Sequence, residues 1–289
     1  MKQFMTCVIL IGWLGAQSAK AQQREFKEEI KKEVSLVGNP NDQTLILQNL
    51  NGSIDVVGYE GENIQITVEK IIWAKNENDL ALGKQEIGIK ILQNGKEIVI
   101  HADVPNMKYK DGHLTSIDCD RYEQPPYDHT LNFNVRMPKN MKLVVGTINN
   151  GDIAVANTRG SYLKANNING GIALKNVTGQ TEVHAINGEV GISYAKNPDA
   201  ASTYYSLNGD INITYQRDLS AEIAFKSMNG ELFTDFDIAK QYAKTSKDQS
   251  GEKNKTKYKY EAKPVVQIGN GALFHDFETL NGDVIIKKI

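Results

Sequence analysis

The sequence predicts an all-β protein, a single-stranded right-handed β-helix (β-solenoid) with coils of about 20 residues and two insertions. An Asn-Gly pair recurs between residues 150 and 230 at spacings of 19, 18, 21 and 21 residues. Apolar residues alternate with polar ones on both sides of each pair, which is typical of half-buried strands. A second break, at Gly160 or Gly179, falls midway through the repeat. Each coil is therefore expected to hold two strands and two corners, and the right-handed sense follows from the general rule for parallel crossovers.

The Asn-Gly pairs are expected to form one corner of each coil. A tight corner with positive φ suits glycine, and asparagine tolerates the same region. Successive asparagines would lie ~4.8 Å apart and hydrogen-bond as a ladder. Ordinary Asn-Gly hairpins are the alternative, but they do not explain a period near 20 residues with a midway break. The predicted structural corners are Asn51, Asn150, Asn169, Asn187, Asn208, Asn229 and Asn281.

Residues 1–21 have the pattern of a signal peptide. Lys2 precedes an apolar run over 7–14 that is too short for a membrane span of ~20 residues. Ala19 and Ala21 fit the small-residue rule for cleavage before Gln22, and a buried N-terminal helix is the alternative. We therefore expect an exported protein, located in the periplasm, at the cell surface or in the medium. Cys7 lies inside the apolar run, so no lipid anchor is expected.

Charge and cysteine content narrow the function further. Of 33 Lys and Arg residues, two lie in the signal segment, so 31 remain against 35 acidic residues and the net charge is −4. Without a basic excess, nucleic acid is not an expected partner. The expected mature chain has one cysteine, Cys119, so stability must come from a core rather than from an internal disulfide. No second apolar run is long enough to predict a transmembrane span.

The chain divides into a charged lead-in over 22–43 and a solenoid domain over 44–289. The lead-in reads as a solvated linker, with a short helix or an extended segment as alternatives. Insertions are expected at 73–130 and 238–264. The first contains a helix candidate at Asn76–Gln85 and a hairpin turn at Asn94-Gly95. At the end of the solenoid, residues 285–289 are expected to form an edge strand that could pair with a second copy.

Several segments resemble a bacterial family named "putative adhesin". They are Thr147–Ile153, Asn187–Val190, Phe233–Phe236 and Thr279–Val284. The resemblance extends over residues 44–72 and 131–289. It implies a single-stranded right-handed β-helix of unknown function, related to head GIN domains. It supplies no catalytic residues.

No group of residues predicts catalysis, so the protein is expected to be non-enzymatic and without a cofactor. A carbohydrate-active β-helix enzyme would need paired carboxylates on one face. Six residues between 113 and 129 are of types that bind metals, but their spacing matches no zinc motif, so a polar loop is favoured and no metal site is predicted. These residues are His113, Asp118, Cys119, Asp120, Asp128 and His129.

Some positions can be assigned to the inside or the outside of the coils. Acidic residues often follow Asn-Gly and are expected to cap the turns rather than bind a cation or sugar. His184 should face solvent and His275 should face the core, and of the adjacent rings Tyr204 and Tyr205 one should face inward and one outward. The acidic residues are Asp152, Glu189, Asp210, Glu231 and Asp283.

The lysine-rich second insertion is the strongest candidate for binding. Its lysines and tyrosines would suit anionic glycan, lipopolysaccharide or membrane headgroups, and a solvated loop is the alternative. The candidate residues are Lys253, Lys255, Lys257, Tyr258, Lys259 and Tyr260. We expect an exported, adhesin-like binding protein that engages glycan or protein at the cell envelope. A self-associating structural protein and a carbohydrate-active enzyme are the alternatives.

Overall fold

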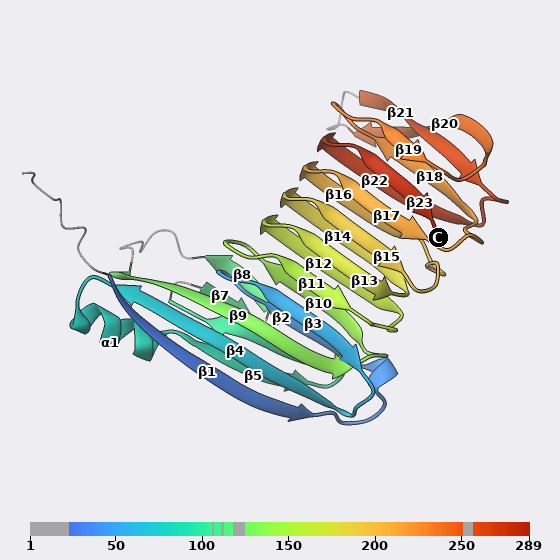
Figure 1. Ribbon diagram of the computed structural model, residues 1–289. Helices are drawn as coiled ribbons and strands as arrows, with labels where there is room; N and C mark the ends of the chain where they lie inside the picture. The colour runs from blue at the N-terminus through green and yellow to red at the C-terminus, as the bar shows by residue number, and fades with distance from the viewer. Residues whose placement is uncertain (1–22, 106, 111–112, 118–124, 251–256) are drawn as a thin grey trace, which may run out of the picture.

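Two large β-sheets face each other along the length of the molecule (Figure 1). The computed structural model describes residues 23–105, 107–110, 113–117, 125–250 and 257–289. The predicted signal peptide therefore lies outside the described residues. Within them, no helix is long and apolar enough to cross a membrane.

The sheets are named A and B. The order of strands across sheet A is β1 (Arg24–Ser35), β4 (Asn63–Ala74), β9 (Tyr127–Pro138), β3 (Ile54–Tyr59), β11 (Ile153–Ala156), β13 (Ile172–Val177), β15 (Val190–Tyr194), β17 (Ile211–Tyr215), β23 (Val284–Lys288) and β19 (Leu232–Thr234). The order across sheet B is β20 (Ile238–Ser250), β21 (Lys257–Ile268), β18 (Ala221–Lys226), β22 (Leu273–Asn281), β16 (Ser202–Asn208), β14 (Gln180–Asn187), β12 (Tyr162–Asn169), β10 (Lys142–Thr147), β2 (Thr44–Gln48), β6 (Glu97–Asp103) and β5 (Gly88–Asn94).

The centre of the molecule is a stack of repeats, each made of a sheet B strand followed by a sheet A strand. In spatial order the repeats are β2–β3, β10–β11, β12–β13, β14–β15, β16–β17, β22–β23 and β18–β19. Neighbouring repeats pair in parallel in both sheets, so equivalent residues lie side by side; Leu143 pairs with Leu163, and Ile153 with Ile172. The Asn-Gly turn joining the two strands of a repeat is called the first corner. The turn leading to the next repeat is the second corner.

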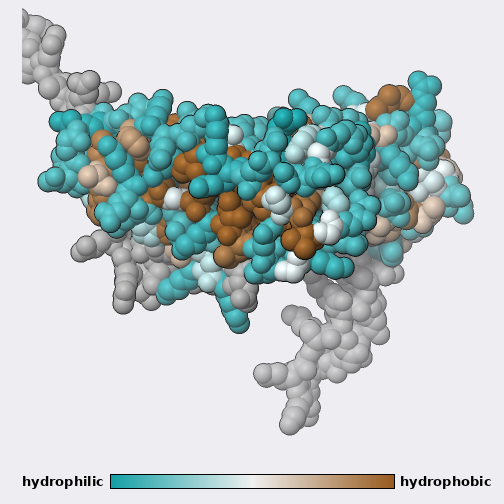
Figure 2. All heavy atoms as spheres, turned by 90° about the horizontal axis from the view of Figure 1, so that it is seen from below, coloured by the Kyte–Doolittle hydropathy of each residue, from teal (hydrophilic) through white to brown (hydrophobic). Residues whose placement is uncertain are grey.

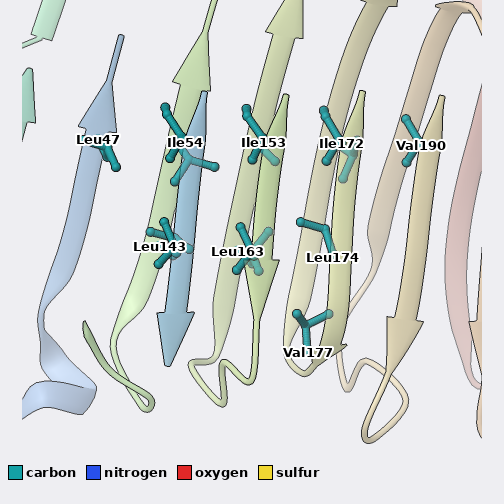
Figure 3. Close-up of a cluster of buried hydrophobic side chains, with 14 of the residues drawn as sticks. Leu47, Ile54, Leu143, Ile153, Leu163, Ile172, Leu174, Val177 and Val190 are labelled. Atoms are coloured by element: carbon teal, nitrogen blue, oxygen red, sulfur yellow. The ribbon is translucent and has the colours of Figure 1, made fainter. Parts of the chain in front are cut away.

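The alternation seen in the sequence builds the core between the sheets. In β10 the residues Leu143, Val145 and Thr147 are buried while their neighbours are half-buried. Strands with this period-2 pattern place one face on the core and the other toward solvent. Figure 3 shows Leu143 and Leu163 from sheet B in a row with Ile153 and Ile172 from sheet A close by. The predicted all-β fold with inward aliphatic residues is thus confirmed.

The C-terminal strand is not an edge strand, which corrects the prediction for residues 285–289. β23 pairs with β17 on one side and with β19 on the other. In the sequence β18 and β19 come before β22 and β23. In the stack, however, the repeat β22–β23 lies between β16–β17 and β18–β19. The physical reason is that the second insertion returns the chain to the inner position, where its strands gain hydrogen bonds on both edges.

The charged segment at the N-terminus is not a solvated lead-in. β1 pairs antiparallel with β4 along its whole length, from Arg24 opposite Ala74 to Ser35 opposite Asn63. Its inward positions carry Phe26, Ile30 and Val34, which pack on the core. Glu28 and Lys32 lie at the inward positions between these apolar residues. The alternation of apolar and polar residues that marks a strand is therefore interrupted in the sequence.

The first insertion extends the stack beyond its β2–β3 end. The predicted helix is confirmed as α1 (Glu77–Glu86), with Asn76 as N-cap accepting the Asp79 N–H at 2.9 Å. The predicted turn at Asn94-Gly95 joins β5 to β6 as an antiparallel hairpin. A second hairpin, β7 (Met107–Lys110) and β8 (His113–Ile117), forms a separate two-stranded sheet. The remaining short helix is η1 (Pro40–Asp42).

Hydrophobic side chains also reach the surface. Seen from below the view of Figure 1, they gather in the middle of the face, and the ends are largely hydrophilic (Figure 2). Among the described residues, the exposed large hydrophobic side chains include Ile168 at 41%, Phe233 at 47%, Ile238 at 49% and Met228 at 75%. The positions of these exposed hydrophobic side chains on the fold indicate which parts of the surface are candidates for binding a partner.

Candidate binding surface

The first corner carries a continuous ladder of asparagine side chains. The amide Nδ2 of Asn169 donates to Asn149 Oδ1 at 3.0 Å, and Asn187 donates to Asn169 at 3.0 Å. Asn208 donates to Asn187 at 2.9 Å, Asn281 to Asn208 at 2.8 Å, and Asn229 to Asn281 at 2.8 Å. The predicted ladder is thus present, in the spatial order of the repeats rather than in chain order.

Two of the predicted corner residues lie outside this ladder. Asn150 is displaced because its turn is one residue longer, so Asn149 takes the ladder position and Asn150 adopts a φ of 56°. Asn51 forms a parallel bridge with Asn149, but its amide lies 3.4 Å from His129 Nε2. The remaining corner residues, Asn169, Asn187, Asn208, Asn229 and Asn281, are ladder members.

The corner glycines are required for close approach rather than for positive φ. Among them only Gly52 and Gly282 have positive φ. At Gly170, Gly188 and Gly209, a Cβ would overlap the carbonyl oxygen of the glycine in the neighbouring repeat. The glycines therefore stack backbone against backbone, which corrects the conformational reason given by the sequence pattern.

Removing one rung should weaken the stack measurably. Asn187→Ala removes the amide that donates to Asn169 and accepts from Asn208. At about 0.5–1.5 kcal/mol for each hydrogen bond, the free energy of unfolding should fall by about 1–2 kcal/mol in urea denaturation. Asn150→Gly should change it by less than about 0.5 kcal/mol, because Asn150 lies outside the ladder and glycine accepts its φ. An equal loss in both variants would contradict the ladder's contribution.

Three of the five acidic residues after Asn-Gly, namely Asp152, Asp210 and Asp283, cap the first corner of a neighbouring repeat, as expected. Asp152 Oδ1 accepts the Gly171 N–H at 2.7 Å, Asp210 accepts that of Asp283 at 2.9 Å, and Asp283 accepts that of Glu231 at 2.9 Å. Burial, followed by the charge of Asp152, raises the pKa of the Asp55 carboxyl. These carboxylates therefore serve the turns of the neighbouring repeats.

An aliphatic stripe runs beside the ladder on the outer face of sheet B. The residue before each ladder asparagine points outward and is aliphatic or methionine. Backbone hydrogen bonds place these residues side by side; for example, Asn169 N donates to Ile148 O and Asn229 N donates to Leu280 O, each at 2.9 Å. The stripe consists of Leu50, Ile148, Ile168, Ile186, Leu207, Leu280 and Met228. Ile168 and Met228 are its most exposed members. The repeated aliphatic residue is visible in the sequence, but its outward direction was not recognised there.

The two insertions frame this outer face. At one end the Tyr109 ring of β7 stacks on His101 of β6 with centroids 3.6 Å apart, and its hydroxyl donates to Ala102 O at 2.8 Å. Val99 and His101 point outward from sheet B, yet both are buried under this hairpin. Burial lowers the pKa of His101. The outer face of sheet B therefore has a raised border at the β6 end.

At the other end, the hairpin β20–β21 contacts β22. Lys244 Nζ lies 4.1 Å from the centroid of the Phe274 ring, and Lys263 forms an ion pair with Asp276. Phe274 and Asp276 both belong to the outward face of β22. The described base of the lysine-rich insertion thus lies against sheet B, and two of its lysines are engaged within the protein.

The structure describes little of the predicted lysine-rich binding site. Lys253 and Lys255 lie outside the described residues. Lys257, Tyr258, Lys259 and Tyr260 belong to β21, and their backbone pairs with residues 247–250 of β20. The hypothesis that they bind an anionic partner stays a prediction.

The outer face also carries a ring pair. His184 and Tyr205 stack with centroids 4.5 Å apart and ring planes 8° apart. His184 is exposed, as predicted. Because each ring covers one face of the other, the pair has only one face of each ring left for stacking a sugar.

His275 has a structural role in the core. His275 is fully buried and its Nδ1 accepts the Ser202 N–H at 3.3 Å, which confirms the predicted core position. Tyr204 is also buried, and its hydroxyl lies 2.7 Å from that of Tyr194 and 3.1 Å from that of Tyr215. Burial lowers the pKa of His275 to about 4, and burial likewise lowers that of His129 to about 4.

The metal-ligand types near Cys119 remain untested, because Asp118, Cys119 and Asp120 lie outside the described residues. Asp128 and His129 follow one another on β9, so their side chains leave opposite faces of the strand. In the part of the chain that the structure describes, no three His, Cys, Asp or Glu side chains are placed to share a metal ion.

Comparison with known families places the chain. The sequence profile of a family described as Toastrack DUF4097 matches residues 33–265. This chain belongs to the Toastrack DUF4097 family. The matched segment begins within β1 and ends within β21, so it includes both insertions. No curated protein matches the sequence.

Solved structures also resemble this Toastrack DUF4097 protein. A "putative cell adhesion protein" from Clostridium sporogenes is 12% identical, with a TM-score of 0.41 over 91% of this chain and 100% of the other. A "putative adhesin" from Bacteroides fragilis is 9% identical, with a TM-score of 0.31 over 91% and 97%. A "putative adhesin" from Parabacteroides merdae is 13% identical, with a TM-score of 0.29 over 91% and 96%.

Proposed function

We propose that this protein is a non-enzymatic, exported, adhesin-like binding protein that engages glycan or protein at the cell envelope. The aliphatic stripe on the outer face of sheet B carries the proposal. Ile168 and Met228 are exposed and the other members are half-buried, so the stripe brings apolar side chains to the surface of a protein that already has an extensive core between its sheets. An apolar surface patch of this kind is typical of an interaction surface.

We further infer that sheets A and B are the walls of a single-stranded right-handed β-helix. The chain alternates between sheet B and sheet A through the central repeats, and the pairing between repeats is parallel. Parallel crossovers of this kind are right-handed in nearly all proteins. Such a scaffold keeps the stripe straight and the spacing of its side chains regular.

The proposal is tested by retention on envelope material. Purified protein is passed over immobilised cell-envelope fractions, and Ile168→Asp is compared with the wild type. Burying an aliphatic side chain contributes about 1.5–3 kcal/mol to binding. The affinity of the variant should therefore be lower than that of the wild type by about tenfold or more. Treating the fractions with protease or with periodate, which oxidises sugar diols, separates a protein partner from a glycan partner.

Val57→Asp is the matched control. Val57 is 39% exposed, close to the 41% of Ile168, but it lies on β3 of sheet A. Retention of this variant should equal that of the wild type. Absence of retention for the wild type, or equal losses in both variants, would contradict the proposed surface. Breakdown of a retained glycan by the pure protein would contradict the non-enzymatic assignment.

Self-association is the second candidate function, and the exposed end of the stack favours it. β19 is the last strand of sheet A and carries Phe233, which is 47% exposed. Beside it lies a cavity of about 220 Å³ whose apolar lining includes Leu232 and Ile238. If this end joins two copies, sedimentation should give a dimer that Phe233→Asp converts to a monomer.

A further inference from the structure

A polar groove lies at the second corner, on the opposite side of the repeats from the asparagine ladder. Its volume is about 710 Å³. The turn between β13 and β14 is only residues 178–179, whereas residues 157–161 and 195–201 form the longer turns on either side. The short turn is thus the floor of the groove and the longer turns are its walls.

No larger side chain fits at the base of the groove, because the backbones of neighbouring repeats are in contact there. A Cβ on Gly160 would overlap the carbonyl of Met141, and one on Gly179 would overlap the carbonyl of Gly160. Two wall residues are held firmly. Asn197 donates to Asp218 at 2.8 Å and accepts from Gln216 N at 2.8 Å. The groove is therefore largely pre-formed by the fold.

Arg159 is the other fixed wall residue. Its guanidinium donates to Asn176 Oδ1 at 3.1 Å and to its neighbour's carbonyl, Thr158 O, at 2.9 Å. These bonds hold the positive charge at the wall of the groove while leaving some of its five N–H donors for a ligand.

Most hydrogen-bonding groups in the groove are not engaged by the protein. The ladder amides at the first corner bond to one another. Within the part of the chain that the structure describes, by contrast, six groove side chains make no hydrogen bond or ion pair. They are Asn41, Asn140, Ser161, Thr178, Lys196 and Asp199. Amide, hydroxyl, ammonium and carboxylate groups thus line one trough.

We propose that this groove binds an extended oligosaccharide, an assignment that rests on the proposed binding function and names a ligand class for a second surface. Asparagine amides and hydroxyl groups both donate and accept, which matches the hydroxyl groups of sugars. Five neighbouring turns line the groove, so at ~4.8 Å per strand it extends for roughly 19 Å. Arg159 and Lys196 additionally suit an acidic sugar, since both carry a positive charge.

Other ligand classes fit the groove less well. Its described lining has no tryptophan or tyrosine, and of the residue types that most often anchor protein partners it has one, Arg159. Asp199 is its one carboxylate among the described lining residues, too few for a calcium or magnesium site. The mixture of amides and hydroxyls favours sugar hydroxyls over both.

An array of neutral gluco-oligosaccharides, N-acetylglucosamine oligomers and acidic oligogalacturonides tests the proposal, followed by calorimetric titration of the strongest binder. The double variant Asn140→Ala/Lys196→Ala should bind that glycan at least tenfold more weakly. Both side chains are exposed and have no partner in the described chain, so folding should be unaffected. Preferred binding of the acidic oligomers would indicate that Arg159 and Lys196 contact the carboxylate groups of the sugar. Preferred binding of the neutral oligomers would indicate that the asparagine amides contact its hydroxyl groups.

The matched control is Asn134→Ala/Lys175→Ala, which removes the same side-chain types from exposed positions on sheet A. Its affinity should stay within twofold of the wild type. Absence of binding to every glycan, or equal losses in the two double variants, overturns the proposal. Ile168→Asp should retain glycan binding here while losing envelope retention, so the two proposals can fail separately.

Discussion

Gly188→Ala is expected to lower the free energy of unfolding by about 3 kcal/mol or more, or to prevent folding. The new Cβ would overlap the carbonyl carbon and oxygen of Gly170 and the nitrogen of Gly171. All three are backbone atoms, so no side chain can move aside. Relief would require the two repeats to separate, which would lengthen the Asn187–Asn169 bond and the bond from Gly170 N to Asn187 O, now 3.1 Å.

Gly191→Ala is the control for this experiment. Gly191 lies three residues further along the same repeat, has no positive φ, and has no atom within 4 Å of an added Cβ. Urea denaturation should show a change within about 0.5 kcal/mol for this surface substitution. If Gly188→Ala lowered the free energy of unfolding as little as Gly191→Ala does, backbone contact at the first corner would not determine the distance between the repeats.

Acid should destabilise the protein through His275. Burial lowers the pKa of its imidazole to about 4 in the folded protein, against 6.5 in the unfolded chain. Between these two pKa values the unfolded state binds more protons, so stability is present above about pH 6.5 and is lost as the pH falls toward 4. At pH 5, 1.5 units below the unfolded pKa, this one group should cost about 2 kcal/mol.

The cause is the surrounding core. The ring of His275 stacks on Tyr215 with centroids 5.8 Å apart and meets Tyr204 edge-on at 6.4 Å. Its Nδ1 accepts from Ser202, and its buried Nε2 has no partner in the described structure. An imidazolium would carry an additional N–H on Nδ1, and this donor would face the Ser202 N–H donor and lose the present hydrogen bond.

His275→Gln should flatten the fall in unfolding free energy between pH 7.5 and pH 5 by about 2 kcal/mol, because glutamine does not titrate. His184→Gln, which removes the exposed histidine of the outer face, should leave most of that fall in place. His129 contributes a further part of the slope, since burial lowers its pKa to about 4 as well. Equal slopes for wild type and His275→Gln would show that His275 is not responsible.

The sequence pattern predicted the elements whose causes are local. Asn76 caps α1 through its own side chain, and the Asn94-Gly95 turn needs only its two flanking strands. The inward position of His275 follows from a period of two along one strand. β1 was missed because its inward-register positions alternate apolar residues with Glu28 and Lys32; Glu28 is opposite the buried Lys70 and lies 3.4 Å from its ammonium group.

The candidate surfaces were less predictable because each depends on distant segments. The aliphatic stripe requires knowing that Ile168 and Met228 leave the same face of one sheet. The second-corner groove depends on turns of unequal length stacking side by side. The stripe leaves one aliphatic residue before Asn-Gly in each repeat, which does not by itself tell which way the side chain points, and the groove leaves no motif within a single repeat.

By itself the sequence determined that this is a β-protein of about 20-residue repeats with asparagine at one corner and aliphatic residues inside. These follow from side-chain alternation and turn chemistry, which act over a few residues. Only the tertiary structure decided that β22–β23 enters the stack before β18–β19, that Asn149 replaces Asn150 in the ladder, and that the glycines serve contact rather than φ. The reason is that strand order and backbone approach are set by hydrogen bonds between residues far apart in the sequence, such as Asn208 and Asn281, which are 73 positions apart.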